Sequence, residues 1–226
     1  MDPISQRVRS VITSLPPHVT LLVAAKGQSA DAVRAALQGG AGTIGHNYVQ
    51  EAEAMIGAVG PGAAHWSMIG HLQRNKASTA VRLFDSVQSV DSLRLAETLD
   101  RHCRRLPRVL PILLEVNVAR EPQKSGVLPE DVVELAREIA RLRSLRIEGL
   151  MTLGPQVQNA EALRPAFRAM RDLLQALRVA CSSEAPPHIL SMGMSDSYPV
   201  ALEEGATMIR LGSLLFGPRA TAPEGD

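Results

Sequence analysis

The stretch Val19-Thr-Leu-Leu-Val-Ala-Ala-Lys26 carries the first evidence for the fold. Its apolar run predicts a buried strand at residues 19–25, and a helical segment begins shortly after Gly27. Lys26 is therefore expected at the carboxyl end of a buried strand, where a strand-to-helix loop begins. In α/β proteins this is the position at which reactive groups gather.

The same pattern, a short apolar run followed by a longer amphipathic segment, recurs along the whole chain. Strands are predicted at residues 19–25, 43–45, 65–69, 83–87, 109–117, 147–151, 188–191 and 207–211. Helices are predicted at residues 4–14, 29–39, 48–58, 91–105, 130–143, 159–180 and 195–204, with Asp91 and the pair Ser195-Asp196 as caps. Repeated βα units force parallel pairing, so the fold class is α/β. The count and even spacing of the strands favour a single (β/α)8 barrel of the TIM type with a leading N-terminal helix over an open doubly wound sheet.

Composition indicates one domain with an aliphatic core. The 226 residues include 45% hydrophobic but only 3% aromatic residues, and no linker divides them. We expect a barrel domain at residues 1–219 and a disordered tail at residues 220–226. The net charge of +1 gives no electrostatic case for a nucleic-acid or membrane partner. Without a signal peptide, a membrane-spanning run or cysteines at metal or disulfide spacing, the chain is expected to be cytoplasmic and free of metal.

Lysine is rare in this chain. Of its 24 basic residues only Lys26, Lys76 and Lys124 are lysines, and the others are arginines. A lysine that escapes this bias is a candidate nucleophile, since lysine but not arginine can lose its proton at an accessible pH. The alternative is a lysine that closes the strand and points into water.

Two loops at the end of the chain resemble phosphate sites. Ser191-Met-Gly193 precedes a helix start at Ser195, and Gly212-Ser213 follows the last strand and opens a short helix. Arg210 lies in that apolar strand, so it must either face the barrel mouth or be paired outside it. A reactive amine beside a phosphate site suggests a phosphorylated aldehyde held as a Schiff base. Pyridoxal 5'-phosphate (PLP) fits this description, and so does the sugar phosphate of an aldolase.

Longer motifs favour PLP. They are Ala25-Lys26, Gly45-x-Asn47-Tyr-Val-Gln-Glu51, His65-Trp-x-x-Ile-Gly-His-Leu-Gln-x-Asn-Lys76, Lys124-Ser-Gly126, Gly149-Leu-Met-Thr152, Leu190-Ser-Met-Gly-Met-Ser-Asp196 and Glu204-Gly-Ala-Thr-Met-x-Arg-x-Gly-Ser213. From about residue 5 to residue 219 the chain resembles the pyridoxal phosphate homeostasis protein family, the single-domain relatives of the alanine racemase barrel.

This resemblance implies a fold-type III PLP barrel and a set of cofactor contacts. It implies a Schiff base between PLP and Lys26, and an arginine, Arg210, facing the pyridine nitrogen. The other implied contacts are Ser191, Gly212 and Ser213 at the phosphate, and Asn47 and His71 along the cofactor face. The implied function is intracellular PLP (vitamin B6) homeostasis as a carrier or buffer, with apo forms of PLP-dependent enzymes as candidate recipients. The chain departs from the family at His46, where Glu is usual, at Gly27-Gln28, and after Asp196.

The main alternative is a PLP-dependent enzyme of the amino-acid racemase type. Racemisation needs a base on each face of the substrate, and Lys26 can serve one face. The second base of the related racemase is a tyrosine on a further domain of a partner subunit, which we do not expect here. Tyr48 is expected to pack as an aromatic at a helix start, and Tyr198 lies in a loop region. These features favour a monomeric, non-enzymatic PLP protein over a racemase. An aldolase is also disfavoured, because it would place its lysine within a later strand.

Overall fold

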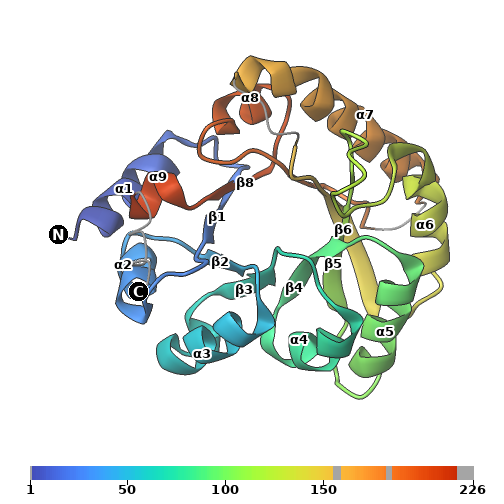
Figure 1. The fold of residues 1–226 in the computed structure, drawn as a ribbon, viewed down its shortest axis with the longest axis horizontal. Helices are drawn as coiled ribbons and strands as arrows, with labels where there is room; N and C mark the ends of the chain where they lie inside the picture. Colours follow the sequence, from blue (N-terminus) through green and yellow to red (C-terminus); the bar gives the residue numbers. More distant parts are fainter. Residues whose placement is uncertain (1, 155–158, 182–184, 218–226) are drawn as a thin grey trace, which may run out of the picture.

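The computed structural model describes residues 2–154, 159–181 and 185–217. Its strands form one closed parallel barrel in which each strand pairs with its neighbours in the chain and β8 pairs with β1 (Figure 1). The strands are β1 (Thr20–Ala24), β2 (Thr43–His46), β3 (His65–Met68), β4 (Ser86–Val90), β5 (Leu110–Glu115), β6 (Leu145–Met151), β7 (Ile189–Ser191) and β8 (Met208–Leu211). The predicted (β/α)8 barrel is confirmed.

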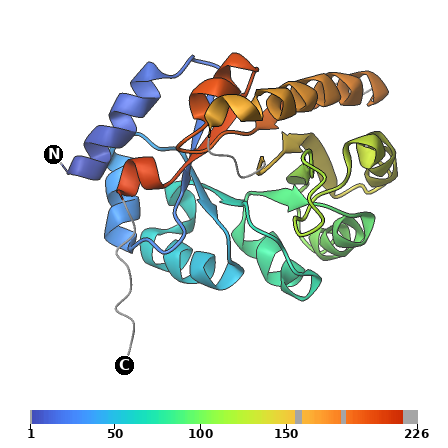
Figure 2. The ribbon, with the colours of Figure 1, turned by 45° about the horizontal axis from the view of Figure 1, so that its top comes forward.

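Helices surround the barrel. They are α1 (Pro3–Ser14), α2 (Ala30–Gln38), α3 (Val49–Val59), α4 (Ala77–Leu83), α5 (Leu93–Cys103), α6 (Val132–Ile139), α7 (Arg164–Ala180), α8 (Tyr198–Glu203) and α9 (Ser213–Phe216). The two ends of the described chain meet, because the leading helix α1 lies beside α9 in both views (Figures 1 and 2). Arg7 Nε of α1 donates to the carbonyl oxygen of Leu215 in α9. The predicted N-terminal helix therefore braces the helix that follows the last strand.

Alternation along the strands divides the buried residues into two layers. Val23, Ile44 and Ile209 belong to the large apolar cluster between the barrel and its helices. Leu22 and Met208 belong to a small cluster, together with Ile69. The barrel interior also holds buried polar side chains that are hydrogen-bonded to one another, among them Ser67, Gln88, Ser191 and Arg210.

The fourth strand was predicted in the wrong place. The expected strand at residues 83–87 overlaps the end of α4, and β4 runs from Ser86 to Val90. Phe84 is fully buried, but it follows the last turn of α4. The strand itself carries Ser86 and Gln88 at buried positions, so its sequence lacks the apolar signal on which the prediction relied.

Two predicted helix caps are also wrong. Ser92, not Asp91, is the N-cap of α5, and Asp91 instead accepts a hydrogen bond from the Ser92 hydroxyl at 3.0 Å. Helix α8 begins at Tyr198, after the predicted caps at residues 195 and 196. The Ser195 hydroxyl accepts from the backbone N–H of Leu214 at 3.2 Å and so joins the loop after β7 to α9. The predicted tail at residues 220–226 lies outside the described residues.

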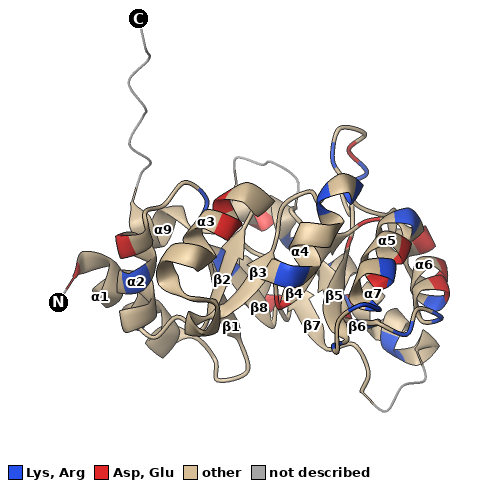
Figure 3. Cartoon of the chain, turned by 90° about the horizontal axis from the view of Figure 1, so that it is seen from below, with Lys and Arg blue, Asp and Glu red and all other residues tan. Residues whose placement is uncertain are grey.

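Positively and negatively charged residues both occur along α5, α6 and α7 (Figure 3). This distribution agrees with the near-zero net charge of the sequence. Among the described helices, none combines the length and apolar character needed to cross a bilayer.

Candidate functional site

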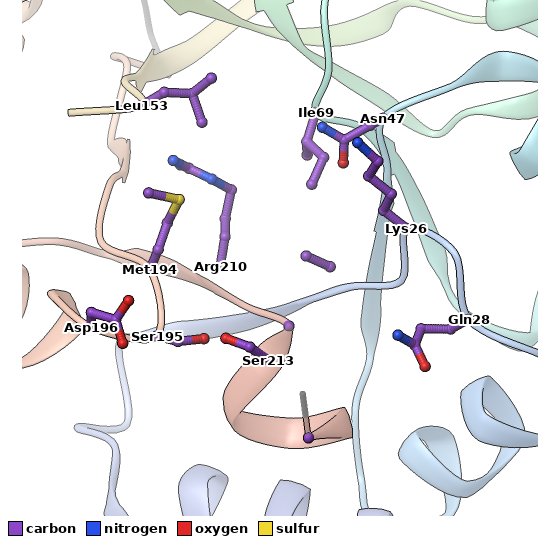
Figure 4. A pocket seen from close by; sticks show the side chains of 13 residues that line it. Lys26, Gln28, Asn47, Ile69, Leu153, Met194, Ser195, Asp196, Arg210 and Ser213 are labelled. Carbon is purple, nitrogen blue, oxygen red and sulfur yellow. The ribbon is translucent and has the colours of Figure 1, made fainter. Parts of the chain in front are cut away.

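A cavity of about 390 Å³ opens at the carboxyl ends of β1, β2, β7 and β8. Side chains from these strands and their loops converge on it (Figure 4). Its lining includes Lys26, Gln28, Asn47, Ile69, Leu153, Met194, Ser195, Asp196, Arg210, Gly212 and Ser213. This is the end of a parallel barrel at which ligands bind, because the loops that follow the strands meet there.

Lys26 follows the last residue of β1 by two positions and reaches the cavity from the rim. Its Nζ donates to the hydroxyl of Tyr48 at 3.3 Å and lies 4.9 Å from the centre of the Tyr48 ring. Tyr48 is 49% exposed. The expectation that Tyr48 is a packed aromatic is therefore wrong: its ring and hydroxyl hold the amine at the mouth of the cavity.

The residue after Lys26, Gly27, belongs to one of the departures from the family pattern. Gly27 has φ +69°, a left-handed conformation that side chains rarely adopt. Its N–H donates to the Glu51 carboxylate of α3 at 3.4 Å. Glycine thus lets the chain turn sharply behind Lys26.

Arg210 is the buried cation of the site, and its side chain is held by the neighbouring strands. Its Nη1 donates to the carbonyl and the hydroxyl oxygens of Ser191 at 2.8 and 2.7 Å, and its Nη2 donates to the carbonyl of Thr152 at 2.7 Å. Burial lowers the pKa of Arg210 to about 10, and the nearby charge of Glu115 opposes that shift. The guanidinium therefore keeps its charge at neutral pH.

A chain of hydrogen bonds connects Arg210 with the opposite end of the barrel. The Ser191 hydroxyl donates to Gln88 Oε1 at 2.8 Å, and Gln88 Nε2 donates to Ser67 Oγ at 3.1 Å. Ser67 and Ser86 are joined at 2.9 Å, and Ser86 Oγ lies 2.9 Å from His65 Nε2. Buried polar groups paired in this way fix each other's positions. The barrel interior therefore sets the orientation of Arg210.

The end of the cavity opposite Lys26 is formed by the loops after β7 and β8. Ser195 and Ser213 lie there (Figure 4), α9 begins at Ser213, and Gly212 before it also lines the cavity. The first N–H groups of a helix have no acceptor within it, and that of Leu214 is donated to the Ser195 hydroxyl at 3.2 Å. A Cβ on Gly212 would lie 3.1 Å from the carbonyl oxygen of Ala24, so the backbone of this loop runs close to β1. Small side chains and backbone donors make this end suitable for an anion.

The cavity brings together most of the predicted site residues. Lys26, Asn47, Arg210, Gly212 and Ser213 line it. Ser191 lies beneath it, with its hydroxyl turned to Gln88 and Arg210. His71 lies in an adjoining cavity, 3.2 Å from Ser125 Oγ and 3.6 Å from the Asp91 carboxylate.

Comparison with known proteins agrees with this geometry. The model of the family "Alanine racemase, N-terminal domain" matches residues 1–220. The pyridoxal phosphate homeostasis protein of Pseudomonas aeruginosa is 38% identical over 207 residues, which is 90% of this chain and 86% of that relative. The chain belongs to the pyridoxal phosphate homeostasis protein family. The member from Aquifex aeolicus is 38% identical over 199 residues, covering 88% of this chain and 86% of its own length.

A solved relative carries the cofactor suggested by the sequence. PipY of Synechococcus elongatus, determined with PLP bound, is 36% identical to this chain, with a TM-score of 0.84. The match covers 95% of this chain and 100% of PipY. The family resemblance read from the motifs is confirmed.

The departure from the homeostasis family at His46 lies away from the cavity of Lys26. The His46 ring is buried and stacks on Trp66, with ring centres 6.0 Å apart. Neither ring nitrogen has a hydrogen-bond partner among the described residues. Burial lowers the pKa of His46 to about 4. The histidine acts as a neutral core residue on the helix side of β2.

This burial predicts a pH effect. The unfolded chain binds a proton on His46 below pH 6.5, whereas the folded chain resists protonation down to about pH 4. The contribution of His46 to stability is therefore complete above pH 6.5 and is lost as the pH falls. We expect the difference in the free energy of unfolding between His46→Phe and wild type to change by roughly 3 kcal/mol in favour of the variant from pH 7 to pH 4. Urea unfolding at both pH values measures the change; an equal difference between the proteins at both would contradict it.

One notable group was missed in the sequence. Glu115 is the last residue of β5 and is 4% exposed, and its Oε2 has no hydrogen-bond partner among the described residues. The sequence could have indicated Glu115 as a site residue, because a lone carboxylate that ends an apolar strand occupies the same kind of position as Lys26. The prediction instead took Asn117 as the end of this strand.

Proposed function

We propose that this chain binds PLP as a Schiff base on Lys26 and acts in intracellular PLP homeostasis as a carrier or buffer. The observation that carries the proposal is the convergence on one cavity of a lysine amine, a buried arginine and the start of α9. PLP would supply an aldehyde for the amine and a phosphate for the opposite end. PipY of Synechococcus elongatus, a solved relative of this chain, was determined with PLP bound.

The residues at each end of the cavity fit the two ends of this cofactor. Lys26 offers its amine at the rim, next to Asn47 and Tyr48. Ser195, Gly212 and Ser213 offer hydroxyls, backbone N–H groups and the positive end of α9 to the phosphate. The resemblance implied a phosphate contact for Ser191 too, but its hydroxyl is engaged with Arg210 and Gln88. We therefore assign Ser195 the contact that the resemblance gave to Ser191.

Arg210 is suited to face the pyridine nitrogen. It is charged, it is held by Ser191 and Thr152, and it lines the cavity from the barrel side. A protonated guanidinium donates hydrogen bonds and does not give up its proton, so it would keep the ring nitrogen unprotonated. This makes the bound ring a weaker electron sink than a carboxylate partner would. Such a site favours holding PLP over catalysing amino-acid chemistry.

The position of Tyr48 also supports a non-enzymatic role. Racemisation needs bases on opposite faces of the substrate. The Tyr48 hydroxyl is in contact with Lys26 Nζ, so these two groups approach from the same side. Tyr198 is partly buried and packs against the apolar core. We extend the proposal to a cytoplasmic monomer that hands PLP to apo forms of PLP-dependent enzymes.

A two-part assay tests this function. The PLP-loaded protein is first mixed with an apo aminotransferase, and we expect recovery of aminotransferase activity together with loss of the cofactor from the carrier. The loaded protein is then incubated with L-alanine alone, and we expect no D-alanine above a protein-free PLP control. Formation of D-alanine at enzymatic rates would favour the racemase alternative, and failure to restore activity would contradict the carrier role.

A further inference from the structure

A second cavity adjoins the cavity of Lys26. It has a volume of about 220 Å³ and lies where β5 and β6 end, beneath the loop that contains Lys124. Leu153, which is 40% exposed, lines both cavities. The volume is far above the roughly 15 Å³ that one water molecule needs. The cavity can therefore hold a small organic molecule.

Glu115 gives this cavity its chemistry. Glu115 lines the cavity although it is only 4% exposed, and its buried Oε2 atom has no hydrogen-bond partner among the described residues. Leaving a buried carboxylate without a hydrogen-bond donor costs several kcal/mol. Burial accordingly raises the pKa of Glu115 to about 7, the charge of Asp91 adds to this rise, and the charge of Arg210 opposes it.

The other polar groups around the cavity already have partners. Lys124 Nζ donates to Glu121 Oε1 and to the carbonyl of Gly154, both at 2.8 Å. The Thr152 hydroxyl donates to the carbonyl of Val116 at 2.8 Å. His71 and Ser125 contact each other. The group around the cavity that lacks a hydrogen-bond donor is thus Glu115. A cationic donor forms the strongest hydrogen bond to a carboxylate.

We propose that this cavity is a second ligand site, which binds a small primary amine in its ammonium form with Glu115 as the acceptor. An anionic ligand is disfavoured, because it would be repelled by the negative charges of Glu115 and Asp91. The nearby cation Lys124 is already paired with Glu121. The site lies outside the cavity to which PLP is assigned. It holds an amine beside that cavity, whether or not Lys26 carries a cofactor.

Ethylammonium chloride is a suitable probe. Calorimetric titration of the full chain at pH 8, in an amine-free buffer of constant ionic strength, should give saturable binding. The same binding is expected in Lys26→Ala, which separates this site from the proposed PLP site. Glu115→Gln keeps the size of the side chain but removes its charge, and should weaken binding at least tenfold. Glu130→Gln, which removes an exposed carboxylate paired with Arg120, is the matched control and should bind like wild type.

Several results would overturn the proposal. They are the absence of saturable binding to wild type, equal affinity in Glu115→Gln, loss of binding in Lys26→Ala, or acetate binding as tightly as ethylammonium. Water alone at Glu115 would give the first of these results. A second measurement covers the case in which Glu115→Gln does not fold. Wild-type affinity should fall between pH 8 and pH 6, as Glu115 takes up a proton, and a constant affinity would contradict the assignment.

Discussion

Lys26→Ala is expected to abolish the visible absorption of the PLP-loaded protein that arises from the Schiff base. The variant lacks the only amine that lines the cavity among its described residues. The fold should persist, because Lys26 lies at the rim and its described side-chain contacts are those with Tyr48. Loss of one such contact costs about 1 kcal/mol or less. Absorbance after PLP loading and gel filtration, together with urea unfolding, measures both effects.

Arg210→Ala is the matched control for that experiment. It removes the other cation of the cavity but leaves the amine in place. Its absorption band should therefore remain, with a shifted position and weaker PLP retention. A Lys26→Ala protein that retains the band, or that fails to fold, would count against the assigned role and position of Lys26.

Gly149→Ala is expected to have the largest effect on stability. Gly149 lies in β6 just after a register shift against β5, and the carbonyl of Glu148 accepts from His188 N–H at 2.8 Å. A Cβ on Gly149 would lie 1.8 Å from the carbonyl oxygen of Ile189 in β7. Backbone atoms of two paired strands cannot move apart without opening the barrel. We expect a loss of more than about 3 kcal/mol in the free energy of unfolding, or failure to fold.

Gly57→Ala provides the comparison. Gly57 lies in α3, and a Cβ there would meet no atom within 4 Å. Alanine should stabilise this helix by about 1 kcal/mol. Urea unfolding of the two variants beside wild type gives both values. Similar stabilities for the two variants would show that the close approach of β6 and β7 does not limit the fold.

The barrel could be predicted because most of its strands are apolar runs that can be recognised in the sequence. The exception, β4, faces an interior in which Gln88 and Ser86 belong to a hydrogen-bonded chain. A polar interior strand carries little hydrophobic signal, so the predicted strand begins instead at the apolar residues Leu83, the last residue of α4, and Phe84, which follows it. The error reflects the polar network that holds Arg210.

The site was predictable down to its loops but not to each side chain. The location of Lys26 at the cavity could be predicted because it directly follows an apolar strand in the sequence. Which serine faces the cavity depends on how the strand ends: Ser191 is still within β7 and points into the barrel, whereas Ser195 lies in the loop beyond it. Spacing alone cannot make this distinction. The separation of His71 from the main cavity likewise depends on its contacts with Ser125 and Asp91.

Attachment of PLP to Lys26 is tested most directly by chemical trapping of the cofactor on the wild-type chain. The PLP-loaded protein is reduced with borohydride and digested, and the modified peptide is identified by mass spectrometry. We expect a single pyridoxyl group, located on Lys26. Modification located instead on Lys76 or Lys124, or no trapped cofactor after saturation with PLP, would contradict it.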